Sequence, residues 1–291
     1  MHFVRAKGIL SSHNGMNLYR GCSHGCIYCD SRSRCYHMEH AFEDIEVKEN
    51  AIELLEYALK HKRHKCMIGT GSMTDPYIPL EMDLGYVRRA LTLIDAYGFG
   101  FTVITKSDRI LRDLDLLQKI NEKTKCVVQM TLTTCDEALC RKIEPNVSTT
   151  GERFAALKKF RDAGIPTVVW LTPILPFIND TKENLSGILE MCAEAGVYGV
   201  IHFGTGMTLR EGNREYFYKQ LDRRFPGLKE KYIRTYGNRY EIESPDSGRL
   251  TKLFHQKCAE SGMVHDNEEL FRYLQTFEEK GAGRQMSLWD M

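Results

Sequence analysis

With 291 residues, the chain is long enough for one well-packed α/β domain and an appendage. Its 40 lysines and arginines balance 39 aspartates and glutamates, which excludes a strongly basic nucleic-acid coat but not a local basic face. No apolar run approaches the roughly 20 residues of a membrane span, no signal-peptide pattern is present, and the ten cysteines lack a small secreted domain as context. We therefore expect a soluble cytoplasmic protein with reduced thiols and no membrane partner.

The first distinctive motif follows a short predicted strand. Met16–Arg20 is expected to be the first strand of a βα barrel, and Gly21–Asp30 then reads GCSHGCIYCD. Its cysteines, Cys22, Cys26 and Cys29, have the spacing CxxxCxxC, and thiolates so spaced on one loop can converge on a single metal centre, as in iron–sulfur proteins. Three protein ligands on a [4Fe–4S] cube leave one iron open for chemistry, much as catalytic zinc sites keep one position free.

A structural zinc site is the alternative for these cysteines, with Cys35 or His37 as the fourth ligand. Zinc ligands usually come as CxxC or CxxxxC pairs, not as this triplet, so the spacing favours the cluster. The charged segment that follows, Arg32–Glu46, has no clear period and is expected to be an irregular extension of the cluster loop.

The chain then alternates between apolar strand patterns and helical stripes. Five more strands are predicted at Cys66–Thr70, Phe101–Thr105, Cys126–Thr133, Thr167–Leu171 and Val197–Phe203. Helices with a buried stripe are predicted around Leu55, Leu91, Leu114, Leu157 and Ile188. Capping boxes mark the start of two of them, Thr149 with Glu152 and Asp180 with Glu183. This alternation predicts a parallel sheet, although six strands fall short of the eight in a closed barrel.

The composition changes after Gly206. We expect residues 1–205 to form the barrel with its cluster loop, and residues 206–280 to form a mainly helical extension that covers its open side. Residues 281–291 are expected to be a flexible tail. The basic and aromatic stretch Arg210–Arg239 in the extension is a candidate for holding nucleic acid, although a solvated helical face explains it equally well.

Several motifs resemble those of the radical SAM superfamily, and within it of the spore photoproduct lyase-related family, often called DNA repair photolyase-like. Besides the cysteine triplet, they are Thr74-Asp75-Pro76-Tyr77, Thr105-Lys106-Ser107, Ile143-Glu144-Pro145 and Pro173-Ile174-Leu175-Pro176. The resemblance implies an α/β fold, a partial (βα)₆ TIM-like barrel, with which the strand count agrees. It also implies that Cys22, Cys26 and Cys29 bind a [4Fe–4S] cluster whose open iron holds S-adenosyl-L-methionine (SAM).

The resemblance further implies a lyase-like enzyme that cleaves SAM to a 5′-deoxyadenosyl radical and acts on DNA, in repair or modification. A flavodoxin- or ferredoxin-type protein would supply the electron. Tyr28 would lie near the adenine of SAM. The methionine end would be held by Gly69, Thr70, Gly71, Ser72, Lys106 and Thr131. For Lys106 there is also a chemical reason, because the SAM carboxylate needs a cation near the barrel mouth; the alternative is an ordinary solvated lysine.

Two positions depart from the family pattern. Spore photoproduct lyase returns a hydrogen atom through a cysteine after the second strand and a tyrosine after the third cluster cysteine, where this chain has Ser72 and Asp30. Neither a hydroxyl nor a carboxylate is a ready hydrogen-atom donor. Cys35 and Tyr77 are candidate catalytic substitutes, although such single residues are more often packing or surface.

The end of the chain carries a short motif. Gln285-Met286-Ser287-Leu288-Trp289 resembles the peptide that binds the bacterial sliding clamp, and Gln285, Leu288 and Trp289 would make the contacts. The alternative is a tail that folds back onto the protein's own surface.

Two other functions stay open at this point. The near-zero net charge and the missing hydrogen donors favour radical modification of a peptide, protein, RNA or small molecule. A non-catalytic metal-binding interaction module is the third possibility, but it leaves Lys106 and the glycine-rich loop without a role.

Overall fold

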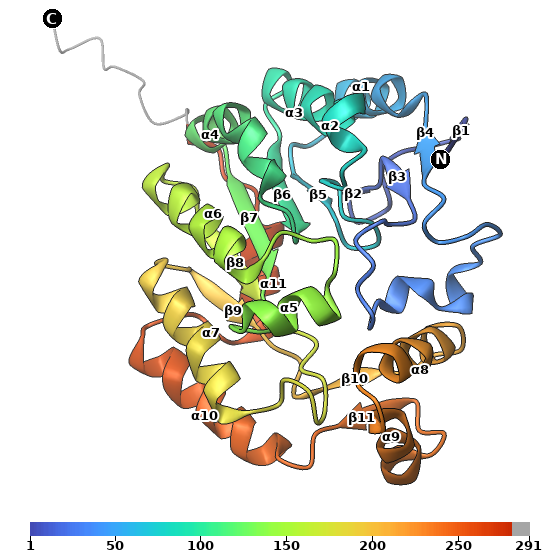
Figure 1. Ribbon diagram of the computed structural model, residues 1–291. Coiled ribbons are helices and arrows are strands. Elements are labelled where there is room, and N and C mark those ends of the chain that lie inside the picture. Colours follow the sequence, from blue (N-terminus) through green and yellow to red (C-terminus); the bar gives the residue numbers. More distant parts are fainter. Residues whose placement is uncertain (281–291) are drawn as a thin grey trace, which may run out of the picture.

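The computed structural model describes residues 1–280, and a six-stranded parallel sheet forms its centre (Figure 1). The strand order is β2-β5-β6-β7-β8-β9, in which each pair of neighbours is parallel. The strands are β2 (Gly15–Met16), β5 (Met67–Thr70), β6 (Gly100–Thr105), β7 (Cys126–Thr131), β8 (Thr167–Trp170) and β9 (Gly199–Ile201). Consecutive strands lie side by side, as βαβ connections require, and the sheet stops at six strands, which confirms the partial barrel.

Two smaller sheets flank the central one. One has the order β1-β4-β3 and comprises β1 (His2–Val4), β4 (Glu46–Lys48) and β3 (Tyr19–Arg20). The other is the antiparallel pair β10 (Gly206–Thr208) and β11 (Glu241–Glu243).

Most of the helices connect the strands. The α-helices are α1 (Ala51–His61), α2 (Glu81–Leu84), α3 (Tyr86–Ala96), α4 (Leu114–Lys123), α5 (Glu137–Ile143), α6 (Thr150–Asp162), α7 (Lys182–Glu194), α8 (Asn213–Arg224), α9 (Leu228–Tyr236), α10 (Ser247–Glu260) and α11 (Asn267–Gln275). Short 3₁₀ helices are η1 (Asp30–Arg32), η2 (Arg34–Tyr36) and η3 (Asp108–Asp113). None of the helices in residues 1–280 combines the length and apolarity that a bilayer crossing requires.

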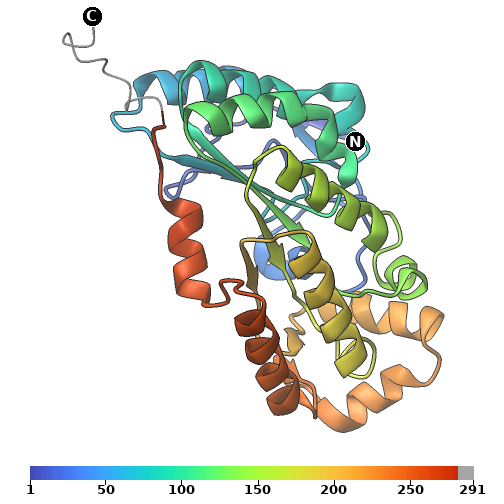
Figure 2. The ribbon, with the colours of Figure 1, turned by 90° about the vertical axis from the view of Figure 1, so that its left-hand side faces the viewer.

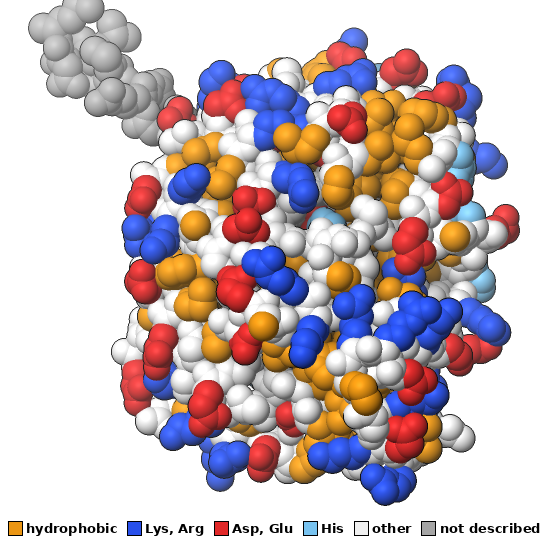
Figure 3. Space-filling view, in the orientation of Figure 1, with side chains coloured by type: hydrophobic (Ala, Val, Ile, Leu, Met, Phe, Trp, Pro, Cys, Tyr) orange, Lys and Arg blue, Asp and Glu red, His pale blue; other side chains and the backbone are white. Residues whose placement is uncertain are grey.

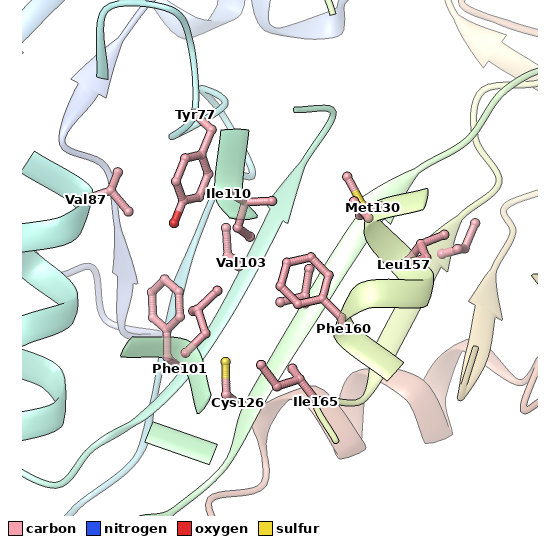
Figure 4. Packing of buried hydrophobic residues seen from close by; sticks show 14 of the residues in the cluster. Tyr77, Val87, Phe101, Val103, Ile110, Cys126, Met130, Leu157, Phe160 and Ile165 are labelled. Carbon is pink, nitrogen blue, oxygen red and sulfur yellow. The ribbon is translucent and has the colours of Figure 1, made fainter. Parts of the chain in front are cut away.

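The main core lies between the convex face of the sheet and helices α1, α3, α4, α6 and α7 (Figure 2). Alternate strand residues such as Val103, Met130 and Val169 point into it, because side chains alternate between the two faces of a strand. Phe160 of α6 and Phe101 of β6 fill this layer (Figure 4).

Helix α11 fills the concave face of the open barrel, on the side of the sheet opposite α4 and α6 (Figure 2). Its Leu270 packs with Val127, Val168 and Ile201, the inward-facing residues of three strands. The chain then follows the amino ends of the strands, where the N–H of Lys280 donates to the carbonyl of Lys123 at 2.9 Å. The interior below the strand ends is therefore a packed core.

The rest of the extension contacts other parts of the barrel. Helices α8 and α9 and strand β11 share a second hydrophobic cluster with the cluster loop and α5, through residues such as Ile27, Ile143 and Phe217. Helix α10 packs against α7. A division of the chain at residues 205 and 280 stays a prediction.

The expected first strand is wrong in one respect. Met16 pairs with Thr70 in the parallel sheet, but Tyr19 and Arg20 pair antiparallel with β4. The segment therefore pairs with two sheets in turn. After Met16 the chain leaves the central sheet, pairs with β4 and continues to Gly21.

The two predicted capping boxes have different outcomes. The box of Thr149 and Glu152 is present at α6. At α7, Thr181 is the N-cap, accepting from the N–H of Asn184, whereas Asp180 accepts from the Ser244 hydroxyl at 2.5 Å. The contact with Ser244 therefore engages Asp180, which the local sequence pattern had predicted to cap α7.

Candidate active site

A cavity of about 1000 Å³ lies at the carboxyl ends of the parallel strands. Residues that follow β5, β6, β7, β8 and β9 line one side of it, and the cluster loop and the β10–β11 pair close the others. In βα barrels this end carries the active site, because loop side chains from several strands converge there.

The three motif cysteines line this cavity together. The loop that carries them begins at Gly21, where φ is +89° and an added Cβ would lie 2.6 Å from the carbonyl oxygen of Phe42, so only glycine fits. The N–H of Cys22 donates to that same carbonyl at 3.0 Å, and the N–H of Ile27 donates to Ile143 at 2.9 Å. The loop is thus held on both sides of Cys26.

The cysteines fit an iron–sulfur cluster. All three are free thiols that converge on one cavity. Burial, with a contribution from Asp75, raises the pKa of Cys22 to about 12, and burial raises that of Cys26 well above its usual range. A bound metal would take the place of these protons, because cysteine ligands coordinate as thiolates. Cys35 and His37 are exposed and do not line the cavity, so the structure gives the alternative zinc site no fourth ligand from either.

Lys106 lines the cavity at the end of β6, beside the cysteines. Burial lowers its pKa, but Cys26, Glu144 and Asp75 raise it more, so the pKa lies above its ordinary value and the ammonium stays charged. A cation held among buried acidic groups suits a carboxylate ligand.

Asp75, from the TDPY motif, fixes this region. Its carboxylate accepts from the backbone N–H of Lys106 at 2.7 Å and from the Thr105 hydroxyl at 2.7 Å. Nδ1 of the buried His24 lies 3.3 Å from the same carboxylate, while its Nε2 is buried without a hydrogen-bond partner in the described chain. The aspartate therefore ties the cluster loop to the end of β6.

Tyr28 also lines the cavity, and its hydroxyl donates to the buried Glu144. Glu144 and Arg153 form an ion pair at 2.6 Å in which neither side chain is exposed. Arg153 also donates to the carbonyl of Thr131 at 2.6 Å, at the end of β7. This network connects the cluster loop to the sheet and holds the tyrosine ring in place.

The predicted SAM-binding loop is only partly at the cavity. Gly71 and Ser72 line it, as does Thr131, whereas Gly69 and Thr70 lie within β5 and do not. An added Cβ on Gly71, where φ is +101°, would lie 2.0 Å from the carbonyl oxygen of Ile104. Glycine is needed here for the loop to approach β6.

The two suggested catalytic residues lie away from the cavity. Tyr77 is fully buried in the main core, and its hydroxyl donates to Asp113 at 3.1 Å (Figure 4). Cys35 is exposed, 3.5 Å from Nη1 of Arg210. The structure therefore gives both a packing or surface environment. The tail residues Gln285, Leu288 and Trp289 lie outside the described residues.

The two positions without a hydrogen donor do reach the cavity. Ser72 lines it directly, as does Asp30. The Asp30 carboxylate accepts from the Tyr36 hydroxyl at 2.9 Å and from Thr208 of β10 at 3.2 Å. Asp30 thus joins the cluster loop to the extension.

Sequence reasoning missed two aromatic residues that line the cavity. Trp170 and Phe203 line the cavity with ring centroids 5.9 Å apart, and Phe203 is 58% exposed. Arg239 lines it from the turn before β11. Trp170 and Phe203 lie at the carboxyl ends of the predicted strands Thr167–Leu171 and Val197–Phe203, which was a usable signal. The place of Arg239 depends on how the extension folds.

Comparison with known proteins identifies the family. The sequence pattern of the radical SAM superfamily matches residues 16–192, which is more than half of the chain. The chain belongs to the radical SAM superfamily. The cofactors of this family are a [4Fe–4S] cluster and SAM, which are the cofactors predicted from the sequence.

The curated relatives are uncharacterized proteins. One from Mycobacterium tuberculosis is 31% identical over 229 residues, covering 76% of this chain and 66% of that protein. One from Methanocaldococcus jannaschii is 32% identical over 169 residues, covering 57% of this chain and 62% of that protein. The chain thus spans less than two thirds of the length of these relatives.

Among solved structures, a cysteine-to-alanine variant of spore photoproduct lyase with dinucleoside spore photoproduct has a TM-score of 0.65. The identity is 14%, and the match covers 90% of this chain and 79% of that chain. A radical S-adenosylmethionine methyltransferase from Kitasatospora setae has a TM-score of 0.50 at 14% identity, covering 67% of this chain and 34% of that one. At these identities the comparison shows a shared fold, which is the radical SAM partial barrel.

Proposed function

We propose that this radical SAM enzyme acts on DNA, in repair or modification. The observation that carries the proposal is that one cavity is lined by the three cysteines, by Lys106 and by the aromatic pair Trp170 and Phe203, of which Phe203 is 58% exposed. Aromatic side chains that line a cavity suit an unstacked base, because a base presents a π-face to the ring. The similar fold of spore photoproduct lyase, solved with a dinucleoside photoproduct, supports the same substrate class.

Different residues of the cavity would hold the cluster and SAM. Cys22, Cys26 and Cys29 would hold the cluster, which together with SAM supplies a 5′-deoxyadenosyl radical. Lys106 would pair with the SAM carboxylate, and Gly71 would give the methionine end close access to the backbone. Such contacts fix the position of SAM relative to the substrate, and the electron would come from a flavodoxin- or ferredoxin-type protein.

The outer part of the cavity would hold the substrate. Phe203 would stack on a base turned out of the helix, and Arg239 would contact a phosphate. Most other cations of the extension have internal roles: Arg214 donates to the carbonyl of Arg239 at 2.7 Å, and Lys231 lies 3.8 Å from the centroid of the Phe177 ring. Lys and Arg side chains nevertheless gather over α8 on the face shown in Figure 3.

One observation favours a second candidate, radical modification of a peptide, protein, RNA or small molecule. Ser72 and Asp30 stand at the cavity where a thiol and a phenol would return a hydrogen atom. Direct reversal of a photoproduct by that route therefore lacks its donors, so a DNA reaction would differ in its last step.

The deciding experiment is anaerobic reconstitution with SAM and dithionite, followed by measurement of 5′-deoxyadenosine by chromatography. We expect formation to rise several-fold with irradiated or unmodified oligonucleotides, and a labelled oligonucleotide to gain or lose hydrogen. The Cys22→Ala variant is the control and should form none. Stimulation by RNA, peptide or small molecules but not by DNA would support the second candidate instead.

A further inference from the structure

A group of metal-ligand side chains lies outside the cavity, on the small sheet behind the cluster loop. One ring nitrogen each of His2 and His40 and a carboxylate oxygen of Asp44 lie within 4.8 Å of one another. Glu46 adds a second carboxylate, with Oε2 3.6 Å from Nε2 of His40. The group is independent of the three motif cysteines.

The fold brings these residues together from two strands and a turn. β1 and β4 are parallel, and their register places His2 directly opposite Glu46. The N–H of Asp44 donates to the carbonyl of Ala41 at 2.9 Å, and this turn places His40 and Asp44 near the strand pair. The imidazole rings of the two histidines meet edge to face, with centroids 4.7 Å apart.

The hydrogen bonds of His40 leave one nitrogen facing the group. Nδ1 lies 3.0 Å from the carbonyl of Ala41, and since a carbonyl only accepts, Nδ1 carries the hydrogen. Nε2 then presents a lone pair, yet it is buried without a hydrogen-bond partner in the described chain and faces a carboxylate. Metal-binding histidines show this arrangement, in which the second nitrogen donates to a backbone carbonyl.

The spacing also suits a four-coordinate metal. Ligand atoms about 2.0–2.1 Å from zinc in a tetrahedron lie about 3.3 Å from each other. His2 Nδ1 forms a 3.0 Å hydrogen bond with Asp44 Oδ2, and the His40–Glu46 distance is 3.6 Å. Glu46 is not within 4.8 Å of every ligand atom of the group, so its side chain would move to join a bound ion. The other oxygen of Asp44 accepts from the Met1 amino group at 2.9 Å.

We propose that His2, His40 and Asp44, with Glu46 as a further ligand, form a binding site for a divalent metal ion of the zinc type. Two neutral imidazoles and two carboxylates balance the charge of such an ion, and mixed nitrogen and oxygen ligands suit zinc. The bound ion would fix the turn at Phe42, whose carbonyl accepts from the N–H of Cys22 at 3.0 Å. The site would therefore stabilise the cluster loop from behind.

The test must separate this site from the cysteines, which also bind zinc. A Cys22→Ser/Cys26→Ser/Cys29→Ser variant, purified without a metal-binding tag and stripped with a chelator, is titrated with zinc chloride by calorimetry. We expect one zinc per chain, and at least about 100-fold weaker binding when His40→Gln or His2→Gln is added. His64→Gln, an exposed histidine after α1, is the matched control and should bind as before.

A second measurement uses the enzyme with its cluster and intact cysteines. Zinc should raise the melting temperature and slow the loss of cluster absorbance in air, and His40→Gln should remove both effects. Circular dichroism of the metal-free variants checks folding; if His40→Gln is unfolded, Glu46→Gln replaces it, with weaker zinc binding expected. No zinc uptake by the cysteine variant, or uptake unchanged by His40→Gln and Glu46→Gln, would overturn the proposal.

Discussion

The buried Glu144–Arg153 pair is the residue-scale feature on which the cluster loop depends. Both side chains are withdrawn from water, and each has its other polar atoms engaged by the Tyr28 hydroxyl or the Thr131 carbonyl. Removing one partner of a buried ion pair strongly destabilises the folded protein, because the other charge stays buried without a counterion. The pair is therefore a structural requirement of the site.

We predict that Glu144→Gln lowers the free energy of unfolding by about 3–5 kcal/mol, because Arg153 would keep a buried charge without its counterion. Urea denaturation of the cluster-free protein measures the change. Asp246→Asn is the control, since the Arg249–Asp246 pair is 65% and 56% exposed and should change stability by less than about 1 kcal/mol. Equal effects of the two substitutions would contradict the prediction.

The same pair predicts a pH dependence. Burial raises the pKa of Glu144, but Arg153 and Lys106 lower it more, so it lies below its ordinary value in the folded protein. Its stabilisation is then fully present above about pH 4.3, the ordinary glutamate value, and is lost as pH falls through the folded pKa. The stability difference between the wild type and Glu144→Gln should be constant from pH 7 to 5 and shrink below about pH 4.

Gly71 gives a second residue-scale prediction. Gly71→Ala combines a positive φ with a Cβ 2.0 Å from the Ile104 carbonyl oxygen, so we expect destabilisation above about 2 kcal/mol and at least tenfold weaker SAM binding. Equilibrium binding of SAM to the reconstituted enzyme tests this. Gly98→Ala shares the positive φ, at +64°, but meets no atom within 4 Å. It should cost only about 1–2 kcal/mol and leave SAM binding unchanged.

At the scale of elements, α11 closes the concave face of the barrel. Leu270 is fully buried against inward residues of β7, β8 and β9. We predict that Leu270→Ala costs about 2–5 kcal/mol and speeds amide exchange in α11, because a cavity replaces the side chain. Ile233→Ala on α9, where the side chain is 46% exposed, should stay within about 0.5 kcal/mol. Similar losses in both would contradict this role of α11.

The sequence predicted those elements whose pattern is local. The β-branched runs of β6 to β9 and the stripes of the connecting helices mark the barrel because each buries a continuous face. The switch of Tyr19 and Arg20 to β4 was not predictable, since it depends on a partner 28 residues away, as the register of Tyr19 with Val47 shows. Likewise Asp180 matched a capping pattern, but the tertiary contact with Ser244 decided its role.

The candidate site was predictable to the same degree. The cysteines were predicted from their spacing, and Lys106 from the family resemblance with support from its position at a strand end; the structure places all four at one cavity. The Glu144–Arg153 pair, the cavity residue Phe203 and the His2–His40 group each need contacts between distant segments. Tyr77 is the opposite case. It lies inside a motif that resembles the family, but its hydroxyl bonds to Asp113 in the core and not at the cavity.

At the scale of the whole molecule, the proposed function places the cofactors beside the cysteines and Lys106 and the substrate beside Phe203 in the same cavity. We predict that Phe203→Ala weakens oligonucleotide binding by about 1–3 kcal/mol, because a stacking surface is lost. The concentration of oligonucleotide that half-maximally stimulates 5′-deoxyadenosine formation measures the effect. Tyr57→Ala removes a 65% exposed aromatic on α1 and should not shift it. An equal shift in both variants would show that Phe203 has no special place.

The hydrogen bond from Lys280 to Lys123 has a geometric consequence for how the enzyme can work alongside other proteins. It places residue 280 at the amino ends of the strands, on the side of the barrel away from the cavity. A partner that contacted the barrel at these amino ends, beside Lys123, would leave the cavity at the opposite end unobstructed. Such a partner and the substrate could then be bound at the same time.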